Sequence, residues 1–224
     1  MHQHRQRRFA LAAPLAALGL LMAAALAPAT AAELYKRDVY FTAGYERQVD
    51  DRTCTAAATA MMLNFIARRD LRLDQMAILR YEQPRDALND ARQRGSDPLG
   101  WSLALTHYST TTGRGPFTYR WEAYDSEYAA LKRAAKQIGW SGRPVGLTVR
   151  HGRHAVVMTG FESTRDPRLG EFRLVAVWVS DPYGSSRKRY LAADSPLDRY
   201  LELDATREYD RAWYGKHVIV APVT

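Results

Sequence analysis

The first half of the chain carries apolar residues at helical spacing. The clearest segment is 53–68, where Ala57, Met61 and Phe65 recur every fourth position among other small and apolar side chains. Thr53 stands where a helix N-cap is expected, and Asp50 and Asp51 lie just ahead of it. The same reasoning predicts further helical segments at 73–80, 85–93, 95–108 and 127–138.

The second half of the chain changes to short, valine-rich runs separated by turn residues, a pattern typical of strands. Asp166-Pro167-Arg168-Leu169-Gly170 is a turn signal, so the runs on either side of it are predicted to form an antiparallel hairpin. Helices followed by antiparallel strands predict an α+β fold. The expected strands are 37–42, 144–149, 154–161, 172–179 and 216–220.

The N-terminal segment has the pattern of a secretory signal peptide. Residues 1–8 carry three arginines and no acid, residues 10–27 are almost wholly apolar, and small residues follow before the first acid, Glu33. We therefore expect a signal peptide at 1–32, a secreted protein, and a single domain at 33–224. An uncleaved membrane anchor is the alternative, although eighteen apolar residues interrupted by Pro14 lie at the lower limit of a bilayer span.

The charge of the chain gives no indication of nucleic-acid binding. The formal net charge is +8, and three of the basic residues lie in the predicted signal peptide, which leaves +5 for the domain. A charge of that size is ordinary for a soluble protein. The preference for arginine over lysine, with abundant alanine, is typical of a GC-rich bacterial genome.

Cys54 is the only cysteine of the sequence. It cannot form an internal disulfide or a cysteine-based metal site, so it is a buried inert thiol, an intermolecular bridge or a nucleophile. Taken alone, a cysteine on an alanine-rich helix is more often a core residue. However, Cys54 lies at the predicted helix N-terminus, where free backbone N–H groups and the helix dipole favour a thiolate.

A nucleophilic cysteine needs a base, and the predicted domain offers His107, His151, His154 and His217. A hairpin centred near residues 167 and 168 would pair His154 with Asp181, because paired positions in an antiparallel hairpin lie at equal distances from the turn. A carboxylate beside an imidazole fixes its tautomer and supports the imidazolium. His151 and His154 point to opposite faces of a strand and no third ligand is apparent, so we expect no metal site.

Three motifs in this order resemble papain-like cysteine peptidases. More narrowly, they resemble the bacterial peptidase family C39, which includes the double-glycine leader peptidases. The motifs are a nucleophile segment from Gln48 to Phe65, a histidine segment at 152–161 and a third segment at 180–184. The likeness extends from about residue 37 to residue 220, nearly the whole predicted domain.

The resemblance implies a papain-like fold with Cys54 as nucleophile, His154 as base and Asp181 as the acid that orients it. Gln48 would donate to the oxyanion beside the Cys54 backbone N–H. Thr55 stands where the family often has glycine, and we expect its side chain to add bulk and a hydroxyl at the mouth of the site.

Among the aromatic residues, we expect Trp101 and Tyr183 to bind substrate beside the cleft. The implied activity is a thiol hydrolase that cleaves peptide or isopeptide bonds of a peptide or protein substrate through a thioester. We expect no cofactor, and no stable membrane partner after removal of the signal peptide. Acyl transfer or cell-wall amidase chemistry on the same triad is an alternative, and a secreted binding module with an idle Cys54 is another.

Overall fold

The computed structural model describes residues 33–87, 95–191 and 213–224. All of them belong to the second of two units of the chain, 1–32 and 33–224. The predicted signal peptide and most of the helical segment expected at 85–93 lie outside the described residues. No helix within the described part of the chain has the length and apolar character needed to cross a bilayer.

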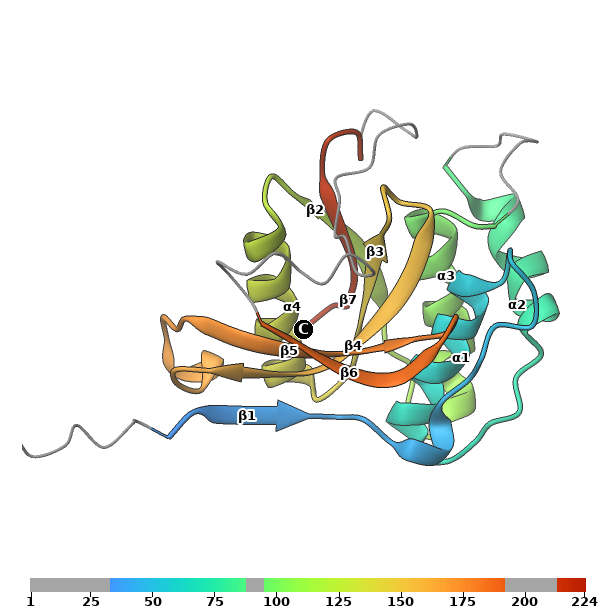
Figure 1. Ribbon diagram of the computed structural model, residues 1–224. Coiled ribbons are helices and arrows are strands. Elements are labelled where there is room, and N and C mark those ends of the chain that lie inside the picture. Colours follow the sequence, from blue (N-terminus) through green and yellow to red (C-terminus); the bar gives the residue numbers. More distant parts are fainter. Residues whose placement is uncertain (1–32, 88–94, 192–212) are drawn as a thin grey trace, which may run out of the picture. The chain divides into compact units, whose positions relative to one another are not determined.

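The described residues form a seven-stranded sheet in which all neighbouring strands are antiparallel (Figure 1). The strands are β1 (Tyr35–Asp38), β2 (Tyr119–Tyr124), β3 (Val145–Val149), β4 (His154–Ser163), β5 (Leu174–Asp181), β6 (Ser185–Leu191) and β7 (His217–Pro222). Their order is β2-β7-β3-β4-β5-β6, and β1 pairs with the second half of β4.

Four α-helices accompany the sheet: α1 (Cys54–Ala67), α2 (Gln75–Glu82), α3 (Pro98–Tyr108) and α4 (Glu127–Ser141). Alternate residues of β4 belong to two separate cores. Val156 and Met158 pack with α4, whereas Ala155 and Val157 pack with α1 and α3. The sheet is therefore covered on both faces, and this explains why all ten residues of β4 are buried.

The predicted α+β class is confirmed, and several boundaries differ from the expected ones. The first strand is 35–38 instead of 37–42, because a 3-10 turn at 42–44 interrupts the extended chain. The helix expected at 73–80 runs from 75 to 82, and Asp74 caps it by accepting from the Met76 N–H. A 3-10 turn at 83–85 ends the helical segment, after which Asp86 is extended.

Two strands, β2 and β6, were not predicted from the sequence. Both lie at the edges of the sheet. The sequence of β6 is Ser-Ser-Arg-Lys-Arg-Tyr-Leu, which lacks alternating apolar residues because an edge strand leaves much of its surface in water. β5 and β6 form a second hairpin, which positions the turn that follows Asp181.

Candidate active site

Cys54 is the first residue of α1 and is half-buried, whereas every residue from Thr55 to Ile66 is buried. Thr53 occupies the N-cap position, as predicted, but its side chain does not cap the helix. Its hydroxyl donates to the Asp50 carbonyl at 3.1 Å and accepts from the Asp50 N–H at 3.2 Å. The first turn of α1 therefore has no side-chain cap, and the positive end of the helix dipole is left to the Cys54 sulfur.

His154 and Asp181 are in contact: His154 Nε2 and Asp181 Oδ1 are 2.7 Å apart. The predicted register of the hairpin is wrong by two residues, since Val157 pairs with Ser180 and Met158 with Val179. A 3-10 turn at 167–169 and two register shifts between β4 and β5 change which residues pair across the hairpin. The contact survives because residues two apart on a strand point to the same face, so a shift of two leaves a diagonal pair within reach.

The electrostatics of this pair favour an imidazolium beside a carboxylate. Burial alone would lower the pKa of His154, which is 7 % exposed. Hydrogen bonds and charge attraction from Asp181 and Cys54 outweigh burial and raise the pKa of His154 to about 9. For Asp181 burial acts in the other direction and would raise the pKa. The interactions with His154, the Tyr183 N–H and the charge of Arg150 outweigh burial, so the pKa of Asp181 lies below its usual value.

The ring of His154 therefore links Asp181 to Cys54. Because Asp181 occupies Nε2, Nδ1 is the nitrogen left to face the Cys54 sulfur. An imidazolium held by a carboxylate can stabilise a thiolate and later deliver its proton to a leaving group.

The backbone around Asp181 is fixed by contacts with a distant loop. Tyr45 donates its hydroxyl to the Asp181 carbonyl at 3.0 Å, and the Gln48 N–H donates to the Pro182 carbonyl at 3.0 Å. The Tyr183 N–H donates to Asp181 Oδ1 at 2.8 Å, so this oxygen accepts two hydrogen bonds. Sequence analysis did not identify Tyr45, because a loop tyrosine carries no periodic signal that would reveal the contact.

Gln48 lies against the turn that leads into Cys54. Its Nε2 donates to the Asp50 carbonyl at 2.8 Å, and the Thr53 N–H and hydroxyl donate to the same oxygen. Its Oε1 is buried without a hydrogen-bond partner among the described residues. One N–H of the amide is used by Asp50 and the second is available to an oxyanion. The oxyanion role of Gln48 remains a prediction.

Two expectations from the sequence are wrong. Trp101 is fully buried in α3 and its ring lies against Gly146, where a Cβ would come within 2.2 Å of the ring, so it cannot contact substrate. Thr55 is also buried, and its hydroxyl donates to Glu82 Oε2 at 2.7 Å instead of lying at the mouth of the site.

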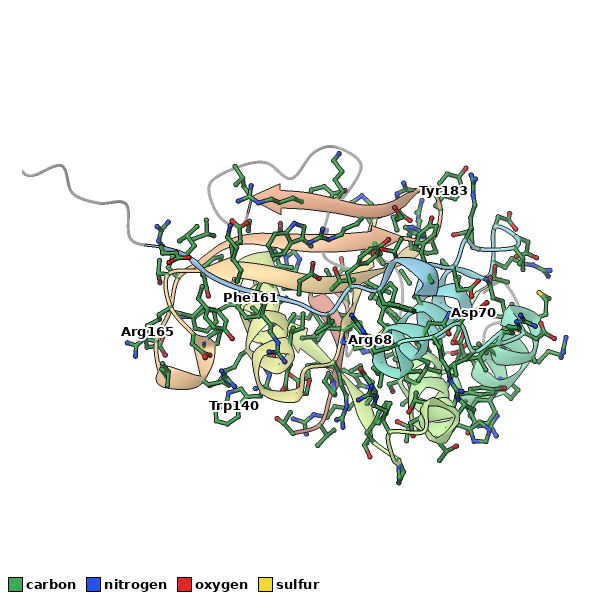
Figure 2. All side chains as sticks on the ribbon, turned by 90° about the horizontal axis from the view of Figure 1, so that it is seen from below. Arg68, Asp70, Trp140, Phe161, Arg165 and Tyr183 are labelled. Carbon is green, nitrogen blue, oxygen red and sulfur yellow. The ribbon has the colours of Figure 1, made fainter. Side chains whose placement is uncertain are left out.

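Tyr183, by contrast, is beside the site and open to solvent. Its side chain is 58 % exposed at the tip of the β5–β6 hairpin (Figure 2). The ring is edge-on to His154 with the two centroids 6.3 Å apart, and Arg150 lies 5.8 Å from its centre. This arrangement is compatible with the predicted contact to substrate. Within the described residues, no three His, Cys, Asp or Glu side chains are grouped to hold a metal ion.

Comparison with known proteins gives one family. Residues 42–207 match the Peptidase_C39 like family, a range that includes Gln48, Cys54, His154 and Asp181. The chain belongs to this family. The fold of its described residues is α+β.

Among solved structures, the crystal structure of UfSP from C. elegans is similar, with a TM-score of 0.49 and 13 % sequence identity. The similarity covers 84 % of this chain and 34 % of the UfSP chain, so this chain spans about a third of that protein's length. None of the curated proteins compared with the chain matches it.

Proposed function

We propose that this peptidase is an exported thiol hydrolase that cleaves peptide or isopeptide bonds through a Cys54-His154-Asp181 triad. One observation supports the triad above all: a single imidazole interacts with both Asp181, at 2.7 Å, and Cys54. Cys54 is also the half-buried start of a helix that is otherwise buried as far as Ile66, as expected for a thiol that meets a substrate.

In the proposed reaction, the Cys54 thiolate attacks the carbonyl carbon of the scissile bond. The negative charge that develops on the carbonyl oxygen is stabilised by the Cys54 backbone N–H and by the second N–H of the Gln48 amide. His154 then transfers its Nδ1 proton to the leaving amine as the carbon–nitrogen bond breaks, which leaves a thioester on Cys54. Water, deprotonated by His154, attacks the thioester and releases the acid product.

The leaving group lies on the side of His154, since this residue protonates it. The exposed ring of Tyr183 stands edge-on to the same imidazole, so we infer that it contacts the substrate on the leaving-group side. Every step uses groups of the protein and water, and the substrate is a peptide or a protein.

A direct test uses a peptide library with the wild type, Cys54→Ala and His154→Ala. We expect Cys54→Ala to abolish turnover, because the thioester cannot form. His154→Ala should lower kcat by ~10²–10⁴-fold, the usual contribution of acid–base catalysis. Circular dichroism checks that both variants fold. Turnover by Cys54→Ala at the wild-type rate would exclude this nucleophile.

The same assay separates hydrolysis from acyl transfer when an amine is added as a competing nucleophile. We expect the acid to be the main product, since the proposal assigns water as the acceptor. A predominant amide product would instead identify an acyltransferase on the same triad.

Export is the second part of the proposal. The charged, apolar and small-residue sequence of 1–32 supports it. We expect N-terminal sequencing of the secreted protein to give a start between Ala32 and Leu34. A secreted chain that still begins at Met1 would contradict cleavage.

A further inference from the structure

A carboxyl group is buried near Cys54, among the helices α1, α2 and α3. Figure 1 shows these three helices together on one side of the sheet. Glu82, the last residue of α2, is 0 % exposed. Its Oε2 accepts from the Thr55 hydroxyl at 2.7 Å and its Oε1 from the Thr59 hydroxyl at 3.3 Å. Both hydroxyls belong to α1, and Thr55 directly follows Cys54.

The site of Glu82 is closed on the side of α3. A Cβ added at Gly100 would come within 2.8 Å of the Glu82 carbonyl oxygen, 2.1 Å of Asp86 Oδ1 and 2.6 Å of Ser96 Oγ. Because only glycine fits there, α3 approaches the backbone at the end of α2 closely.

Glu82 has no cation beside it in the described part of the chain, and burial raises its pKa to about 8. Hydrogen bonds from Thr55 and Thr59 on α1 and from Ser96 lower the pKa only in part. The titratable groups that interact with Glu82 are Asp86, which follows α2, and Tyr108 at the end of α3. Asp86 in turn contacts Asp97, the N-cap of α3. At neutral pH Glu82 is therefore an uncharged acid.

The first turn of α1 needs such a directional contact. Much of the helix surface in this region is formed by Ala56, Ala57, Ala58 and Ala60, whose side chains end at Cβ. Smooth alanine surfaces constrain the rotation and axial position of a helix weakly, whereas a hydrogen bond of 2.7 Å constrains both. The far end of α1 is held separately by Asn64, whose Oδ1 accepts from the Leu71 N–H at 2.9 Å.

We propose that Glu82 is a positioning residue for Cys54: its buried carboxyl holds the Thr55 hydroxyl, and with it the first turn of α1, so that the sulfur faces His154. The inference rests on the proposed role of Cys54 and extends it to a group that does not touch the substrate. The uncharged form suits this position, because a carboxylate there would oppose the thiolate at the same helix end.

The test compares three variants. Thr55→Val removes the hydroxyl and keeps the shape, Thr55→Ser keeps the hydroxyl, and Thr59→Val removes the second hydroxyl, which is one turn further from Cys54. We expect Thr55→Val to lower kcat ~10- to 100-fold with little change in KM, as for a misplaced reacting group. Thr55→Ser should restore kcat to within about threefold, and Thr59→Val should lower the melting temperature but not kcat.

The alkylation rate of Cys54 by iodoacetamide provides a readout that needs no peptide substrate. The rate should fall in Thr55→Val in parallel with kcat. Cys54→Ala serves as the control for labelling at other side chains. Equal losses of melting temperature in Thr55→Val and Thr59→Val, with alkylation rates like the wild type, would mean that the hydroxyls only stabilise the fold and would overturn the proposal. If the protein cleaves no peptide but the alkylation rate of Cys54 still depends on Thr55, the proposed function is wrong and the positioning role of Glu82 stands.

The pH dependence of alkylation tests Glu82 itself. In the wild type the pH profile of the alkylation rate should show a step near pH 8, where Glu82 ionises. In Glu82→Gln this ionisation is absent, so only the step near pH 9 should remain, where His154 loses its proton. Identical profiles for the two proteins would contradict the positioning role of the uncharged acid.

Discussion

Asp181→Asn removes the negative charge next to His154 but keeps an oxygen that can accept the hydrogen bond from Nε2. The pKa of His154 is raised from 6.5 to about 9, which corresponds to about 3 kcal/mol in favour of the imidazolium. This is a net value, because burial acts in the opposite direction and both Asp181 and Cys54 contribute to the rise. A hydrogen bond contributes roughly 1.5–3 kcal/mol with a charged partner and roughly 0.5–1.5 kcal/mol with a neutral one. The substitution therefore removes about 1–1.5 kcal/mol and should lower the pKa of His154 by about one unit, to about 8.

The pKa of His154 can be measured by NMR of its ring protons across the pH range. A suitable control is Asp166→Asn, which makes the same change at the other end of the β4–β5 hairpin, where the carboxylate pairs with Arg168. The control should leave the pKa of His154 at about 9. A pKa that also stays near 9 in Asp181→Asn would refute the view that the charge of Asp181 holds the proton on His154.

The same substitution should destabilise the protein in a defined pH window. The pKa of His154 is raised in the folded state, so its stabilisation is complete below pH 6.5 and is lost as pH rises through about 9. The pKa of Asp181 is lowered, so its stabilisation is present above about pH 3.8 and is lost as pH falls below that value. The difference in free energy of unfolding between wild type and Asp181→Asn should therefore be largest between about pH 4 and 6.5. Urea unfolding that gave the same difference at pH 6 and pH 10 would contradict this linkage.

Other substitutions test the remaining site residues. Gln48→Ala should lower kcat by ~10²–10³-fold with KM little changed, because an oxyanion donor acts in the transition state; an unchanged kcat would mean that another group stabilises the oxyanion. Tyr183→Ala should raise KM without lowering the melting temperature, since the side chain is exposed, and an unchanged KM would remove it from the substrate site. Trp101→Ala should cost ~3–5 kcal/mol of unfolding free energy in urea, the usual cost of truncating a buried aromatic residue. A selective change in KM with full stability would restore Trp101 to the cleft.

Local pattern was sufficient for the elements that carry the proposed chemistry. The apolar period of α1 and the turn signal between β4 and β5 predicted both elements to within a few residues. Cys54 at a helix N-terminus followed from the same pattern. The contact between His154 and Asp181 was predicted as well, although from a register wrong by two residues, because positions two apart on a strand share a face. These features depend on the period of side chains along one helix or strand, and that period is a property of the chain itself.

Features that depend on what packs against a residue were not predictable in this way. Trp101 and Thr55 were expected at the cleft, and both are buried because α2 and β3 cover them. Glu82 has the sequence context of an ordinary helix-end glutamate, and only the approach of α1 and α3 makes it a buried acid. The sequence by itself determined which residue types stand at the start of α1 and along the hairpin. The tertiary structure alone decided which side chains lose their water, because burial, and with it the pKa of a group such as Glu82, is set by neighbours that are distant in the chain.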